Sequence, residues 1–230
     1  MTVQSYFQSR ADWFHDLYEE DQPFRYRVNR VVRGAIYERV ALTLNEFRGW
    51  KDFTVLDVGC GPGRNSVAFV QAGAAHVLGI DFSERMLEIA REFSRNHGAA
   101  SKCEFVKADF MARSFDEKSD AAVALGLFDY LQNPENALRR MMAAAKYKVI
   151  ASFPRPSPIR APLRKLRYAL RGCPVYFYTR QQIVDMCHRV GLERFEIMRL
   201  SSAGYLLVGS LDDYPLDLQS DDGVPTSAIA

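Results

Sequence analysis

The chain has 230 residues, 48% of them hydrophobic, which excludes an intrinsically disordered protein and suffices for one domain with a well-buried core. Its apolar residues are too dispersed for a membrane span, and a pI near 8.3 is modest for a nucleic-acid binder. Four cysteines without metal-type spacing and four histidines without an H-E-x-x-H motif predict reduced thiols, a cytoplasmic location and no bound metal. The sequence shows no charged-then-apolar secretion leader, so none is expected.

The first predicted element is a buried strand that runs into a glycine-rich loop. Apolar residues dominate positions 53–58, as in a parallel strand that is covered on both faces. Gly59, Gly61 and Gly63 follow, and glycine permits positive φ and a close approach of a ligand to the backbone. The segment 64–70 can start a helix whose first amide groups point back at this loop. Strand, loop and helix together predict a site for a nucleotide-like ligand.

Two residues separate the candidate ligands. A dinucleotide loop, G-x-G-x-x-G, needs glycine at the position of Arg64. Asp57 lies two places before the first glycine, where a carboxylate would repel a pyrophosphate but attract a cation or an amino group. S-adenosylmethionine (SAM) carries a sulfonium and an α-amino group and no phosphate. The pattern resembles the first motif of the class I SAM-dependent methyltransferases (hydrophobic, acidic, hydrophobic, G-x-G-x-G), and the resemblance covers roughly residues 50–210.

Repeated strand–helix units along the chain predict one doubly wound α/β domain. The resemblance implies a mostly parallel, seven-stranded, Rossmann-like sheet with an N-terminal helical cover. Helices are expected to begin at Ser83, Asn133 and Thr179, which are suitable N-cap residues, and the last of these is expected to stop at Gly191. The further strands are expected at residues 76–80, 103–107, 121–127, 148–153, 195–200 and 205–208.

Three acidic residues are expected to hold SAM and its product, S-adenosylhomocysteine (SAH). Asp81 ends the second strand, close to where an acid meets ribose hydroxyls in nucleoside-binding α/β sheets, although it could also be a plain helix-entry carboxylate. In the resembled family an acid at the position of Asp109 bonds the adenine amino group. Phe82 and Phe110 either flank the base or belong to the core. The full set of expected cofactor contacts is Asp57, Gly59, Cys60, Gly61, Gly63, Asp81, Phe82, Asp109, Phe110, Leu125 and Leu127.

The resemblance places the methionine end of SAM and the methyl acceptor beside the residues that follow the fourth strand. A general base is needed only if the acceptor is a hydroxyl or a poorly acidic carbon, because a carboxylate acceptor requires alignment and charge neutralisation alone. The candidate bases are His15, Asp129 and Tyr130. His15 stands in an aromatic stretch that resembles a lid, and the alternative for it is a partly exposed helix histidine.

Basic residues are concentrated in two segments. Seven of them and no acid occur between residues 155 and 180, and five arginines face one glutamate near the N-terminus. The resemblance implies that residues 1–48, a lid, and the basic insert at 154–178 lie over the carboxyl ends of the strands. A small anionic metabolite or a lipid-like acceptor would suit these covers. Its expected contacts are Tyr18, Arg155, Arg160 and Tyr178.

Other interpretations stay open for the charges and for the function. The basic residues could form a solvated helix face, and an amphipathic helix at 158–171 could lie on an anionic membrane surface. The SAM-binding domain is expected at 49–210, and the acidic residues 211–230 are expected to be a flexible tail. The main alternative to a methyltransferase is a SAM-binding regulatory or assembly protein of the same fold. An RNA methyltransferase is less favoured, because Phe128-Asp129-Tyr130 stands in place of an Asn/Asp-Pro-Pro-Tyr/Phe signature.

Overall fold

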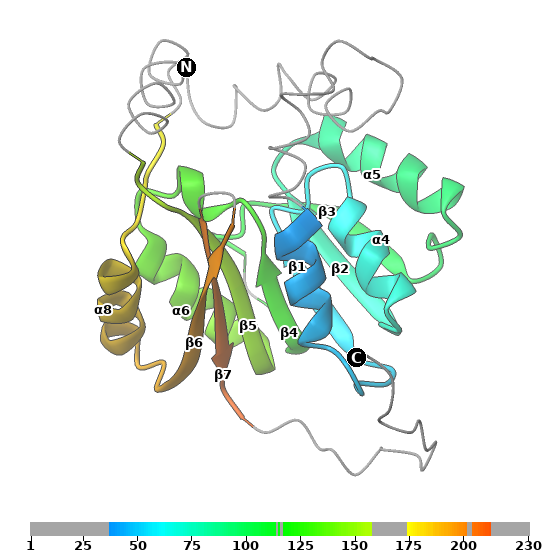
Figure 1. Cartoon of the computed structure of the whole chain (residues 1–230). Coiled ribbons are helices and arrows are strands. Elements are labelled where there is room, and N and C mark those ends of the chain that lie inside the picture. The colour runs from blue at the N-terminus through cyan, green and yellow to red at the C-terminus, as the bar shows by residue number, and fades with distance from the viewer. Residues whose placement is uncertain (1–36, 114, 116, 158–173, 202–203, 213–230) are drawn as a thin grey trace.

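A computed structural model describes residues 37–113, 115, 117–157, 174–201 and 204–212 (Figure 1). Several predicted features lie outside these residues: the first 36 residues of the N-terminal cover with His15 and Tyr18, the part of the basic insert with Arg160, and the acidic tail from residue 213.

The described residues form one seven-stranded sheet with the strand order β3-β2-β1-β4-β5-β7-β6. The first five strands are parallel, and β7 is antiparallel to both of its neighbours. The mostly parallel, doubly wound α/β fold is therefore confirmed, with β4 in the centre of the sheet. The strands are β1 Thr54–Val58, β2 His76–Asp81, β3 Cys103–Lys107, β4 Ser119–Ala124, β5 Ala145–Pro154, β6 Arg194–Leu200 and β7 Gly204–Ser210.

Helices cover both faces of the sheet (Figure 1). One face carries a helix at residues 37–45 together with α4 and α5, and the other carries α6 and α8. None of the described helices is long and apolar enough to cross a bilayer. The labelled helices are α4 Arg64–Gln71, α5 Glu84–Asn96, α6 Pro134–Ala144 and α8 Arg180–Val190, with a short 3-10 helix, η1, at Phe128–Tyr130.

The alternation of side chains along β1 divides the core and positions the site. Leu56 and Val58 pack in the cluster beneath α6 and α8, whereas Val55 packs on the opposite face with the aromatic cluster of Phe47 and Phe53. Because side chains two residues apart share a face of a strand, Asp57 lies on the side of Val55, which α4 covers. The acidic residue of the glycine motif is thus held inside the fold.

Local sequence signals set most of the element boundaries. The side chains of Ser83, Asn133 and Thr179 each accept a backbone N–H bond at the start of a helix, as predicted, and Gly191 ends α8 in the left-handed conformation. Two boundaries differ from the prediction by three residues: β4 ends at Ala124 and not at position 127, and β5 begins at Ala145 and not at position 148. Gly126 adopts φ 94° and donates its N–H to the Ser152 hydroxyl, so the chain turns away from the sheet early.

Candidate functional site

The loop between β1 and α4 is a tight turn in which Gly59, Gly61 and Gly63 all have positive φ, a conformation that favours glycine. Gly63 has φ 75°, and a Cβ there would lie 2.7 Å from the Cβ of Ala90 on α5. Gly61 has φ 51°, and a Cβ there would meet no atom within 4 Å. The amide groups of Gly59 and Cys60 donate to the carbonyl of Ile80, which ties this loop to the end of β2. One glycine therefore serves packing, whereas Gly61 presents its backbone to open space.

Asp57 is a buried carboxylate at the end of β1, and its exposed fraction is 1%. The Ser66 hydroxyl on α4 donates to its Oδ2 over 2.6 Å, but Oδ1 is buried and has no hydrogen-bond partner among the described residues. Burial raises the pKa of Asp57 to about 7; the Ser66 hydrogen bond and the charge of Arg39 oppose this rise, and the charge of Asp81 adds to it. A buried acceptor without a partner is costly, so Asp57 is poised to receive a donor or a cation.

Arg39 is a site residue that the sequence analysis missed. It belongs to the helix at 37–45, and an ideal Cβ at Gly126 would lie 3.2 Å from its Nη1. Its Nε is buried without a hydrogen-bond partner. The helix is fixed at this place because both carboxylate oxygens of Glu38 accept bonds from Ser201, which follows β6. No local motif signals this arrangement, since Arg39 is distant in sequence from both Asp57 and Gly126.

Asp81 holds the glycine loop and the start of α5 together. Its Oδ2 accepts the N–H of Gly61 over 3.0 Å, and its Oδ1 accepts the N–H of Ser83 over 2.8 Å. Burial raises the pKa of Asp81, and these amide groups oppose the rise. Each carboxylate oxygen can accept a further hydrogen bond, so a ligand hydroxyl could still bind. The predicted ribose contact is therefore compatible with this geometry and stays a prediction.

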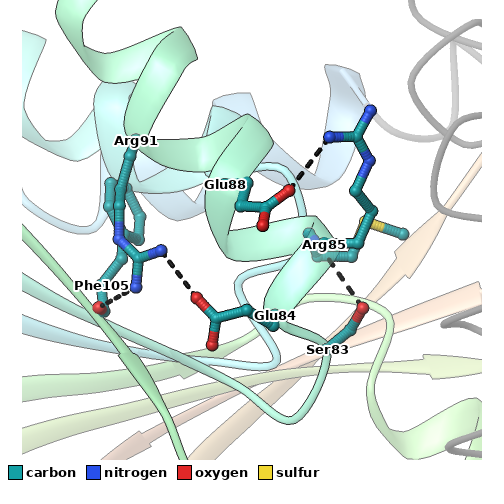
Figure 2. Close-up of polar contacts among 7 residues, drawn as sticks. Ser83, Glu84, Arg85, Glu88, Arg91 and Phe105 are labelled. Atoms are coloured by element: carbon teal, nitrogen blue, oxygen red, sulfur yellow. Dashed lines mark hydrogen bonds and ion pairs between the residues drawn. The ribbon is translucent and has the colours of Figure 1, made fainter.

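The start of α5 is anchored to β3 by polar contacts (Figure 2). The guanidinium of Arg91 forms an ion pair with Glu84 at 2.9 Å and donates to the carbonyl of Phe105 over 3.1 Å. On the same helix, Arg85 pairs with Glu88 at 3.0 Å. The Arg91 contacts connect α5, whose N-terminus follows Asp81, to the backbone of β3.

The structure places several predicted cofactor contacts in the core. Cys60, Phe110 and Leu125 are between 3% and 7% exposed, and their contacts with a cofactor stay predictions. Burial raises the pKa of the Cys60 thiol well above its usual value, which makes it unreactive. Leu127 lies against Gly59, where an ideal Cβ would be 3.2 Å from its Cδ1. Phe82 is half-buried beside Asp81.

The segment after β4 carries two of the candidate bases and is tied to the chain after the basic insert. Asp129 and Tyr130 are half-buried in η1. The carbonyl of Asp129 accepts the N–H of Tyr176 over 2.8 Å, and the Tyr178 hydroxyl donates to the carbonyl of Phe128 over 3.2 Å. Tyr178 was predicted to contact the acceptor, but its ring is only 7% exposed and it packs in the core, where it supports this segment.

The remaining predicted residues lie around the carboxyl edge of the sheet. Asp109 is exposed after β3, and its Oδ1 accepts the N–H of Met111 over 2.8 Å. Arg155 follows β5; it is half-buried, and its Nε is buried without a hydrogen-bond partner. Within the described ranges no group of three or more His, Cys, Asp or Glu side chains could hold a metal ion. The carboxyl ends of the strands therefore bring together the buried acid Asp57, the arginines Arg39 and Arg155, and the backbone of Gly61.

Comparisons with known proteins agree with this geometry. Residues 55–148 match the model of a methyltransferase domain family. A ubiquinone biosynthesis O-methyltransferase of Pseudomonas paraeruginosa is 34% identical over 96 residues, which are 42% of this chain and 41% of that protein. A sterol 24-C-methyltransferase of Neurospora crassa is 36% identical over 73 residues, which are 32% of this chain and 19% of that protein. The chain thus spans about two fifths or less of the length of these relatives.

Among solved structures, the magnesium protoporphyrin IX methyltransferase of Synechocystis with bound SAH has a similar fold. It superposes with a TM-score of 0.74 at 22% identity and covers 90% of this chain and 97% of its own. A complex of that enzyme with SAM gives a TM-score of 0.71. Residues 55–148 are therefore similar to a methyltransferase domain, and the described residues share the fold of this SAM-binding methyltransferase.

Proposed function

We propose that this protein is a SAM-dependent methyltransferase that acts on a small anionic or lipid-like acceptor. The observation that carries the proposal is the buried Oδ1 of Asp57, which has no partner and lies in the electrostatic range of the Arg39 guanidinium. A carboxylate beside a guanidinium matches the ammonium and carboxylate of an amino-acid zwitterion. The methionine end of SAM is such a zwitterion. The positive charge of its sulfonium is also attracted to an acidic site.

In this proposal each part of the cofactor is bound by a different described residue. Asp57 takes the ammonium group and Arg39 the carboxylate of the methionine end, while the backbone at Gly61 allows the close approach. Asp81 accepts from the ribose hydroxyls, and Asp109 accepts from the adenine amino group. In the reaction the bond from sulfur to the methyl carbon breaks as the acceptor atom forms its bond in line, and SAH leaves. The protein contributes alignment and the exclusion of water.

Arg155 supports the anionic class of acceptor. Arg155 comes directly after β5 and is partly buried. Because β4 and β5 are parallel neighbours, it lies at the same end of the sheet as the carboxyl end of β4. The relatives act, by their names, on ubiquinone precursors, sterols and magnesium protoporphyrin IX, so a small molecule rather than RNA is the proposed acceptor. Asp129 or Tyr130 serves as the base if the acceptor atom is a hydroxyl, and neither is required for a carboxylate acceptor.

Isothermal titration with SAM, SAH and NAD tests the cofactor assignment. The wild-type protein should bind SAM and SAH but not NAD, and Asp57→Asn should weaken SAH binding about tenfold to a hundredfold, because a charged hydrogen bond is lost. Asp185→Asn removes an acid on the outside of α8, which only Gln181 contacts among the described residues, and should bind like the wild type. Heat from NAD alone would refute the assignment.

Methyl transfer is tested separately from binding. SAM with a radiolabelled methyl group is incubated with magnesium protoporphyrin IX, a ubiquinone-precursor phenol and a sterol, and the labelled product is extracted. Transfer to one of them supports an enzyme and names the acceptor class. SAM binding without transfer to these or to a wider set of carboxylate and phenol acceptors would favour a regulatory SAM-binding protein.

A further inference from the structure

The loop after β3 holds Asp109 by its backbone. The carbonyl of Asp109 accepts the N–H groups of Ala112 and Arg113, and its side-chain Oδ1 accepts the N–H of Met111. The Asp109 side chain itself is exposed, and its described contacts are to this loop alone. The direction of its carboxylate is therefore set by whatever holds the loop.

Arg140 on α6 holds this loop from the other side. Its Nε donates to the carbonyl of Phe110 over 2.9 Å, and its Nη2 donates to the carbonyl of Arg113. Its guanidinium also lies 5.7 Å from the centre of the Phe110 ring, within range of a cation–π contact. A planar guanidinium presents its donors in a rigid fork, so two carbonyl groups three residues apart are fixed relative to one another.

We infer that Arg140 is a positioning residue for recognition of the adenine amino group. It acts through the loop: the guanidinium holds the peptide groups on both sides of the turn, and the turn directs the carboxylate of Asp109 to the base. This inference rests on the proposed function, in which Asp109 accepts from the adenine amino group. Arg140 itself makes its described contacts with loop carbonyls and a core ring, so it is assigned no contact with the cofactor.

The neighbouring Arg139 provides a matched control. Arg139 is exposed on the same helix; it donates to the carbonyl of Arg189 and pairs with Glu135, and neither contact involves the loop at 109–113. Replacement of Arg139 by methionine removes the same charge from the same helix. A difference between the two variants therefore isolates the contacts with the loop.

The test compares two ligands: SAH, and S-inosylhomocysteine, in which a carbonyl replaces the adenine amino group. In the wild type SAH should bind about tenfold to a hundredfold more tightly, because the 6-position of the analogue carries an acceptor in place of the donor that faces Asp109 in the proposal. In Arg140→Met this preference should fall to a few-fold, mainly through weaker SAH binding. Arg139→Met should retain the full preference, and Arg140→Lys, which keeps the cation but has a single donor nitrogen in place of the fork, should recover part of it.

Thermal unfolding of each variant accompanies the titrations. A folded Arg140→Met with the wild-type preference would overturn the inference and leave Arg140 as a structural residue. If Arg140→Met does not fold, Arg140→Lys decides, and an undiminished preference in it would count against the inference. A wild type that binds both ligands equally would overturn the inference as well, whereas a wild type that does not bind SAH would overturn the proposed function.

Discussion

At the residue scale, the proposed role of Asp57 couples ligand binding to the release of a proton from its carboxyl group. Its pKa of about 7 in the free protein means that the carboxyl is largely neutral below that pH. A bound ammonium group requires the carboxylate and lowers its pKa, so binding below pH 7 releases a proton. The affinity for SAH should therefore rise up to about tenfold per pH unit as the pH increases towards 7, and then level off.

Titration calorimetry in two buffers of different ionisation enthalpy counts the released proton. We expect nearly one proton at pH 6 and a smaller number at pH 7.5. Asp57→Asn should bind more weakly and with little dependence on pH over this range. An affinity of the wild type that is flat from pH 5.5 to 7 would show that Asp57 does not meet the ammonium group.

Asp81 combines two tasks, and one substitution can separate them. Asn at this position retains one oxygen that can accept the N–H of Gly61 or of Ser83, so the fold should survive with a modest loss of stability. The affinity for SAH should fall about tenfold to a hundredfold, because a charged acceptor for the ribose is lost. The measurements are a titration and a urea unfolding curve. Unchanged affinity in a folded variant would remove Asp81 from the ribose site.

At the scale of elements, the loop between β1 and α4 contains two glycines with opposite sensitivities. Gly63→Ala places a methyl group 2.7 Å from Ala90 at a positive φ, and we expect a loss of at least about 2 kcal/mol in the free energy of unfolding. Gly61→Ala meets no atom within 4 Å, so its cost should be about 1–2 kcal/mol from the left-handed backbone alone.

The same pair should behave differently with ligand. The methyl group of Gly61→Ala enters space that no described atom fills, and the proposal places the cofactor in that space, so SAH binding should be lost while the variant stays folded. Urea unfolding with and without SAH distinguishes the two effects. Strong stabilisation of Gly61→Ala by SAH would contradict this placement of the cofactor.

Elements whose limits depend on neighbouring residues could be predicted from the sequence. The start of α8 is an example, since Thr179 and Gln182 form a capping box from within four positions. The end of β4 depends instead on Ser152, which bonds Gly126 from 26 residues away, and the prediction there was wrong. Arg39 was missed for the same reason, because a distant contact between Glu38 and Ser201 places its helix.

The candidate site was named in the sequence from the residues of one motif. Asp57, near the end of β1, and the glycines of the following loop lie together, as their spacing predicts, and their contacts with a cofactor stay predictions. The sequence could not show that Tyr178 turns its ring inward, since the carbonyl that its hydroxyl contacts belongs to Phe128, fifty residues earlier. Whether Asp109 binds adenine stays a prediction.

At the scale of the whole molecule, the positive charge of Arg155 after β5 should affect binding of the acceptor and not of the cofactor. Arg155→Gln should lower kcat/KM for an anionic acceptor about tenfold to a hundredfold and leave SAH affinity nearly unchanged. KM of the wild type should rise with salt, because exposed charges are screened over about 8–10 Å at physiological ionic strength. Arg48→Gln, an exposed change in the turn after the helix at 37–45, is the control. Equal loss in both variants would leave Arg155 without a specific role.

The strand order also has a consequence for synthesis on the ribosome. β7 lies between β5 and β6, so β6 has no place in the sheet until the residues that follow it have emerged. Until then β5 is an open edge whose unpaired backbone groups invite aggregation. Ser152, which fixes Gly126 at the site, pairs with Leu206 of β7. A nascent chain that stops before β7 therefore lacks two strands and the pairing partner of Ser152, and β5 stays an unpaired edge until β7 has emerged.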